Sequence, residues 1–187
     1  MMSTIASMVA PEDVLELLVS HGGESYFGEP VTVLEHCLQA AHFAVASRRT
    51  PELIVAALLH DVGHLLHHEG EDVAEQGVDT RHEELGEQLL AQHLPAAVTE
   101  PIRLHVAAKR YLCFADAEYL KTLSPSSLLS LDLQGGPMSE DKAASFLSLP
   151  FARDAVALRH WDDEAKIPAL AVPDAPSYFP LLQALWH

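Results

Sequence analysis

Apolar residues recur at the spacing of an amphipathic helix along most of the chain. Start signals accompany several of these stretches, such as Thr50-Pro51, which pairs an N-cap residue with a proline at the first helical position. Thr80-Arg81-His82-Glu83 matches a capping box. We expect helices over residues 11–20, 30–47, 52–66, 80–93, 97–113, 115–123, 139–147 and 151–166.

Three segments lack this periodicity. Residues 67–79 are polar and contain glycine, and residues 124–137 are rich in Ser, Gly and Pro, so both are predicted to be loops. The tail 167–187 contains four prolines and is predicted to be irregular. No useful strand alternation occurs, so the prediction is one all-α domain over residues 1–187, a helical bundle.

The composition limits the classes of partner and the location that we expect for the protein. Eleven basic residues stand against 27 acidic ones, and the net charge of −16 argues against nucleic acid as a partner. The sequence contains no run of 18 apolar residues, so no membrane span is predicted. The first ten residues lack the basic segment of a signal peptide, and a cytoplasmic protein is therefore expected. Cys37 and Cys113 lie in apolar stretches and are predicted to be buried thiols.

The strongest chemical signal is the pair His60-Asp61, which follows an apolar helical run. A buried carboxylate needs a partner, and a metal ion is one; an Asp can bridge two ions while the neighbouring His binds one. The same predicted helices carry further candidate ligands. These are His36, His82, His105 and Asp162. Imidazole and carboxylate together suit iron, manganese or zinc better than calcium.

Two more polar residues share a helical face with these candidates. Lys109 lies four residues after His105, and His64 lies four residues after His60. A metal ion would repel the Lys109 ammonium unless an anion lay between them, so the spacing favours an anionic ligand. A solvent-exposed cation at Lys109 and a solvated helix end at His64 are the plainer alternatives.

The order His36, His60-Asp61, His82, His105, Asp162 resembles the H…HD…H…H…D pattern of the HD-domain superfamily, over about residues 26–166, and its additional histidines match the two-metal branch. Three further elements are similar to the mixed-valent di-iron oxygenases that cleave organophosphonates, distant relatives of myo-inositol oxygenase. These elements are Tyr26-Phe27-Gly28-Glu29, the run from His105 to Lys109-Arg110-Tyr111-Leu112, and Trp161-Asp162-Asp163.

The resemblance implies two iron ions, Fe(II) and Fe(III), without an organic cofactor. One iron would be held by His36, His60, Asp61 and Asp162, and the other by Asp61, His82 and His105. Glu29 would ligate iron in the absence of substrate, with Tyr26 moving alongside it as a gate. Substrate contacts would come from His64, Lys109, Ser127 and Gln134, with Ser126 as the alternative to Ser127. The implied reaction uses O2 to convert a 1-hydroxy-2-aminoethylphosphonate, with a free or N-methylated amine, into a carboxylic acid and phosphate.

Two alternatives remain open at this point. A metal-dependent phosphohydrolase acting on a nucleotide or small phosphate ester would use the same six ligands but leave the Tyr26–Glu29 element without a role. A binding protein or regulator that kept its metal without turnover is the non-enzymatic alternative.

Overall fold

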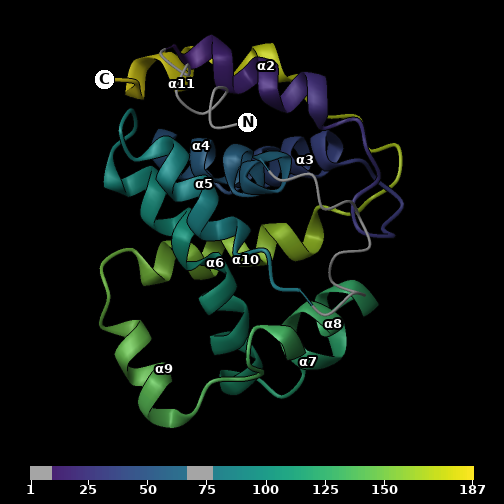
Figure 1. Cartoon of the computed structure of the whole chain (residues 1–187), viewed down its shortest axis with the longest axis vertical. Coiled ribbons are helices and arrows are strands. Elements are labelled where there is room, and N and C mark those ends of the chain that lie inside the picture. Colours follow the sequence, from purple (N-terminus) through teal and green to yellow (C-terminus); the bar gives the residue numbers. More distant parts are fainter. Residues whose placement is uncertain (1–9, 67–77) are drawn as a thin grey trace.

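The computed structural model describes residues 10–66 and 78–187, and this part of the chain is built from helices (Figure 1). They are α2 (Pro11–His21), α3 (Val33–Ala46), α4 (Pro51–Leu59), the 3-10 helix η1 (Val62–Leu66), α5 (His82–Leu90), α6 (Ala96–Ala115), α7 (Tyr119–Thr122), α8 (Pro125–Leu133), α9 (Glu140–Leu147), α10 (Ala152–Glu164) and α11 (Ala175–Leu185). Its β structure is one isolated bridge, between Ser25 and Thr32. The predicted all-α class is confirmed.

The helix α6 is the longest of these and packs against α5, α4 and α10. The helix α10 in turn contacts α3, and α3 packs against α4, so these helices enclose the centre of the molecule. Figure 1 shows α2 and α11, from opposite ends of the chain, side by side at one end, and α7, α8 and α9 at the other. The centre therefore receives side chains from segments far apart in the sequence.

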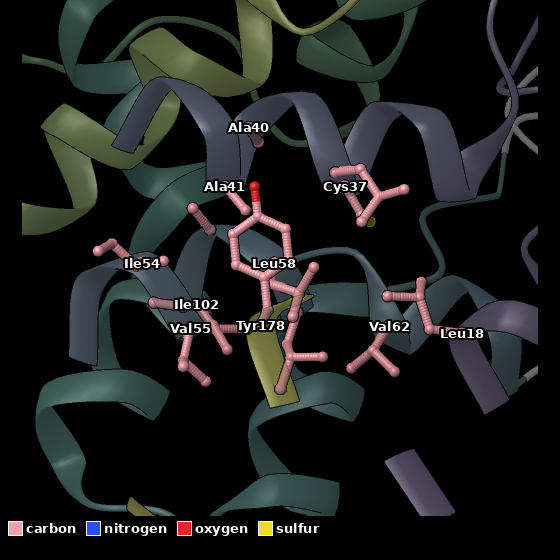
Figure 2. Close-up of a cluster of buried hydrophobic side chains, with 14 of the residues drawn as sticks. Leu18, Cys37, Ala40, Ala41, Ile54, Val55, Leu58, Val62, Ile102 and Tyr178 are labelled. Carbon is pink, nitrogen blue, oxygen red and sulfur yellow. The ribbon is translucent and has the colours of Figure 1, made fainter. Parts of the chain in front are cut away.

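The apolar core joins α2, α3, α4, α6 and α11. Figure 2 shows Leu18, Leu58, Ile102 and Tyr178 meeting in this cluster, and each is almost completely buried. Cys37 lies in the same cluster as a free thiol and Cys113 is buried in a smaller one, so the expectation of buried cysteines is confirmed. No helix in the described ranges is long and apolar enough to cross a membrane.

Two predictions about irregular structure were wrong. Residues 124–137 are not a loop throughout, because Ser124 caps α8 by accepting a hydrogen bond from the Ser127 backbone and Pro125 occupies the first turn. The tail is not irregular throughout, because α11 forms over Ala175–Leu185 and buries Tyr178 and Leu182. In both segments proline lies where a helix begins, and there its missing N–H costs nothing. Pro180, inside α11, is tolerated because the helix is anchored by this burial.

Some of the helix starts predicted from the sequence are found in the structure, and others are not. Thr32 and Glu35 form a reciprocal capping box before α3, and the Thr50 side chain caps α4 as expected. The box predicted at Thr80 does not form, because α5 begins after Arg81, which adopts a left-handed backbone (φ 50°). Of the predicted loop at 67–79, residues 67–77 lie outside the described part of the chain.

Candidate metal centre

The His60-Asp61 pair lies where a helix breaks. The helix α4 ends at Leu59, and after Asp61 the chain continues as η1, so the two side chains leave the apolar face of α4 for the centre of the molecule. Gly63 allows α5 to approach closely, because a Cβ atom there would lie 1.9 Å from the His82 carbonyl oxygen. This contact brings the first residue of α5 next to Asp61.

His36 and His60 present a first pair of imidazole nitrogens, with their Nε2 atoms 3.1 Å apart. The Nδ1 atom of His36 is 2.9 Å from the Ala165 carbonyl oxygen, and that of His60 is 2.9 Å from the Ala57 carbonyl oxygen. A carbonyl accepts only from N–H, so in each neutral ring Nδ1 carries the proton and Nε2 is a bare lone pair. Two lone pairs face each other in a site without solvent exposure.

His82 and His105 form a second pair, again with Nε2 atoms 3.1 Å apart. His105 Nδ1 lies 2.7 Å from the Ile102 carbonyl oxygen, which fixes the same tautomer. Burial lowers the pKa of His105 to about 4 and that of His82 well below its ordinary value, so both rings are neutral near pH 7. His82 Nδ1 instead faces the Glu83 carboxylate, 3.7 Å away.

Asp61 lies between the two pairs. Its Oδ2 is 3.5 Å from Nε2 of both His36 and His60, and its Oδ1 is 3.4 Å from Nε2 of His82 and 3.7 Å from that of His105. Each of the two Asp61 carboxylate oxygens thus faces one of the two histidine pairs. We call the group His36, His60 and Asp162 the first half-site, and the pair His82 and His105 the second half-site.

Asp162 completes the first half-site from α10. Its Oδ1 lies 3.5 Å from His36 Nε2, and its Oδ2 accepts a hydrogen bond of 2.7 Å from Arg159. Burial raises the pKa of Asp162, but the positive charge of Arg159 outweighs it and holds the carboxyl well below its usual range. The carboxylate is therefore charged and oriented.

This donor set fits two transition-metal ions. Two nitrogens held at right angles about one ion at ~2.1 Å stand about 3 Å apart, which is the spacing of both pairs. Bare lone pairs turned toward each other, with a carboxylate between them, are stable only around cations. Both triplets, His36-His60-Asp61 and Asp61-His82-His105, have the proximity of metal ligands. The chain therefore has a cluster of histidine and aspartate side chains arranged to hold metal.

A cavity of about 440 Å³ opens onto this centre. Asp61, Asp162 and both histidines of the second half-site line it, whereas His36 and His60 do not. All the other sequence-predicted residues also line it, namely Tyr26, Glu29, His64, Lys109, Ser126, Ser127 and Gln134. The fold therefore brings together every residue of the predicted site.

Lys109 is a buried cation on the wall of this cavity, 2% exposed. Its Nζ donates to Ser130 Oγ at 2.8 Å and to the Ser127 carbonyl oxygen at 3.5 Å. Burial, followed by the charge of Arg159, lowers the pKa of Lys109 to about 7. An anion in the cavity would restore its full charge. Nearby, Gln134 Oε1 is buried without a hydrogen-bond partner among the described residues.

Tyr26 and Glu29 take different places in the site. The Tyr26 hydroxyl donates to Asp61 Oδ2 at 2.7 Å, and its ring stacks on that of His36 with centroids 3.9 Å apart. The carboxylate of Glu29 instead accepts from Ser126 Oγ at 2.8 Å and pairs with Lys166 at 3.1 Å. His64 stacks on the His82 ring with centroids 3.9 Å apart.

Three functional neighbours had no role assigned from the sequence. Arg159 precedes Asp162 by three residues, and this helical spacing was the available signal. Ser130 is three residues after Ser127, on the helix that was taken for a loop. Lys166 contacts Glu29, 137 residues away in the sequence, and no local pattern indicates that pairing.

The comparisons with known proteins agree with this geometry. The HD domain family model matches residues 33–126. The chain belongs to the HD-domain family. It is 50% identical over 169 residues to a hydroxymethylphosphonate dioxygenase of Gimesia maris, covering 88% of this chain and 82% of the relative. It is 42% identical over 164 residues to the glycine-betaine-forming [1-hydroxy-2-(trimethylamino)ethyl]phosphonate dioxygenase of Leisingera caerulea, covering 88% and 84%.

A third relative, the uncharacterized protein L432 of Acanthamoeba polyphaga mimivirus, is 32% identical over 156 residues, covering 82% of this chain and 71% of the relative. The resemblance to the organophosphonate oxygenases, drawn from the sequence, is confirmed.

Proposed function

We propose that this HD-domain protein is a di-iron oxygenase that uses O2 to cleave the carbon–phosphorus bond of a small 1-hydroxyphosphonate. The observation that carries the proposal is the pair of facing imidazole sets with Asp61 between them, beside the buried cation Lys109 in one cavity. The names of the two dioxygenase relatives support the same reaction class.

The balance of the reaction is simple. The 1-hydroxyphosphonate R–CH(OH)–PO3 consumes one O2, C1 becomes a carboxylic acid, and phosphorus leaves as inorganic phosphate. When bound, Fe(II) and Fe(III) supply the oxygen activation and the redox capacity that this oxidation requires. No organic cofactor is needed.

The chain's own residues would bind the metal ions and orient the substrate. The ligands are His36, His60, Asp61, Asp162, His82 and His105, as the sequence predicts. Lys109 holds the phosphonate by charge, and Ser127, Gln134 and His64 place hydrogen-bonding groups on the same wall. Tyr26 keeps its proton, because burial and the charge of Asp61 raise its pKa well above the ordinary value. It therefore acts as a hydrogen-bond donor, and Glu29 would ligate iron only in the absence of substrate.

The substituent on C1 defines the candidate substrates. They are hydroxymethylphosphonate, 2-amino-1-hydroxyethylphosphonate and its trimethylammonium analogue, which differ only in what they place beyond C1. A cationic amine would need an acidic or aromatic surround. Asp79 and Phe27 are the cavity-lining residues of those types that neither ligate metal in the proposal nor hold the gate.

Phosphate release by iron-loaded protein from these three compounds, with and without O2, tests the proposal. We expect release that requires O2 from at least one of them. The variant Asp61→Ala, which removes the carboxylate shared by both half-sites, should lose both metal ions and reduce the rate by about 10³-fold or more. Hydrolysis of a phosphate ester without O2, together with no release from the phosphonates, would instead identify a phosphohydrolase.

A further inference from the structure

Lys166 lies directly after α10, and the backbone on both sides of it is pinned to α3. The Ala165 carbonyl oxygen is 2.9 Å from Nδ1 of the metal ligand His36. The Ile167 N–H donates to Gln39 Oε1 at 3.0 Å, and the Ile167 carbonyl accepts from Gln39 Nε2 at 2.9 Å. Because His36 and Gln39 are three residues apart, one face of α3 fixes both neighbours of Lys166.

The side chain of Lys166 has three oxygen partners for its three donors. Nζ lies 3.1 Å from Glu29 Oε1, 3.1 Å from Ser124 Oγ and 3.2 Å from Ser127 Oγ. The two side chains of the Lys166–Glu29 pair are only 12% and 13% exposed, so water screens the pair weakly. Lys166 also lies over the Tyr26 ring, 5.9 Å from its centroid.

Glu29 and Tyr26 belong to one tight turn. The Glu29 N–H donates to the Tyr26 carbonyl at 2.8 Å, and the central residues, Phe27 and Gly28, both have positive φ values of 47° and 75°. These are the features of a type I′ turn. The hydrogen bond that closes this turn links the backbone of Glu29 to that of Tyr26, whose hydroxyl donates to Asp61.

We propose that Lys166 is a positioning residue that competes with the metal centre for the Glu29 carboxylate and thereby makes a coordination position easier for the substrate to take. This inference rests on the proposed function, in which Glu29 ligates metal in the absence of substrate. Without Lys166, the cationic side chains left on the cavity wall are Lys109 and Arg159, and Arg159 is already paired with Asp162 and Asp163. The bound metal ions would then be the strongest unpaired positive charges within reach of the Glu29 carboxylate. The freed carboxylate then competes with the substrate for the metal.

The test is the pair of variants Lys166→Met and Lys166→Arg, with Lys121→Met as a matched control at an exposed lysine that pairs with Glu118. Two affinities are measured on the intact protein: that for iron, by competition with a chelator, and that for the phosphonate, by anaerobic calorimetry on the iron-loaded protein. In Lys166→Met we expect iron to bind about tenfold more tightly and the phosphonate about tenfold more weakly. KM should rise while kcat stays within about threefold, because saturating substrate displaces the carboxylate.

The opposite signs separate positioning from a general structural role, since a damaged fold would weaken both affinities. Lys166→Arg should recover most of the phosphonate affinity, and Lys121→Met should match the parent protein. In Lys166→Met/Glu29→Gln the neutral amide competes poorly for iron, so the phosphonate affinity should return toward that of Glu29→Gln alone. Unchanged affinities in Lys166→Met, a loss of both, or no suppression by Glu29→Gln would overturn the inference.

The iron-affinity measurement needs no turnover, so the two proposals fail separately. If the parent protein releases no phosphate from any phosphonate with O2, the proposed function fails, whatever Lys166 does. If the parent protein is active but the two affinities do not move in opposite directions, only the role of Lys166 fails.

Discussion

Each half-site of the metal centre has one buried cation beside it, and the two cations have opposite surroundings. Arg159, beside the first half-site, donates to Asp162 and to Asp163, and it contacts the Tyr119 hydroxyl. Lys109, one helical turn after His105 of the second half-site, donates to a hydroxyl and a carbonyl, neither of which is charged. Both side chains are almost completely buried.

The pKa shifts of the two cations express this difference. Burial lowers the pKa of Arg159, but the charges of Asp162 and Asp163 outweigh it, and the net shift is upward. Burial dominates at Lys109, whose pKa falls to about 7. Removing a compensated cation leaves its buried partners without a counter-charge, whereas an uncompensated cation costs stability and is available to a ligand. The cation beside the first half-site is therefore tied to carboxylates of the protein, and the cation beside the second is available to a ligand.

Removing the compensated cation should have the largest effect on stability. Arg159→Met leaves Asp162 and Asp163 buried without their positive partner, so we expect the free energy of unfolding of the metal-free protein to fall by about 3–5 kcal/mol. Urea denaturation in the presence of a chelator measures it. Arg103→Met, which removes a partly exposed arginine paired with Glu100, is the control and should cost less than about 1 kcal/mol. A similar loss of stability in both variants would contradict the prediction that Arg159 compensates buried carboxylates.

Removing the uncompensated cation, Lys109, should instead raise the free energy of unfolding. The pKa of Lys109 is lower in the folded than in the unfolded state, so the folded state binds fewer protons between about pH 7 and its ordinary pKa. The cost of burying the charge is fully present below pH 7, and it disappears as the pH rises through that interval. Lys109→Met should therefore stabilise the metal-free protein at pH 6.5 by about 1–2 kcal/mol, with a smaller gain at pH 9.

The same Lys109→Met protein should bind the phosphonate at least about tenfold more weakly, because it lacks the cavity-lining cation that donates to no carboxylate. Urea unfolding at both pH values, with Lys121→Met as the control, measures the stability change, and calorimetry measures the affinity. A destabilised Lys109→Met at pH 6.5 would show that the Ser130 and Ser127 contacts outweigh the cost of the buried charge.

The sequence predicted the centre better than its surroundings, for a physical reason. His36, His60, Asp61 and His105 were identifiable because polar residues within apolar helical stretches have to find partners. The all-α class followed from the same periodicity. These signals are local, since each needs only a few neighbouring residues, whereas His82 and Asp162 were identified by their place in the H…HD…H…H…D order.

Residues whose partners are distant were not identifiable in this way. The Lys166 side chain meets Glu29 only after α10 and the Tyr26–Glu29 turn pack together, so no spacing in the sequence could indicate the pair. The helix α8 was missed because Ser, Gly and Pro are typical of loops, although Ser124-Pro125 is also a helix start. The roles assigned to the cavity residues remain predictions, and turnover and affinity measurements will test them.

A final comparison separates the two half-sites by the stability cost of removing one histidine from each. His36 is fully buried and its Nδ1 is paired with the Ala165 carbonyl, whereas His82 is 8% exposed and lines the cavity. In the metal-free protein, His36→Ala should leave a void and an unpaired carbonyl and cost about 2–3 kcal/mol. His82→Ala opens toward the cavity and should cost about 1 kcal/mol or less. Urea unfolding in chelator compares the two directly. Equal costs would mean that the second half-site is as firmly packed as the first. Only the positions of its ligands would then make it accessible from the cavity.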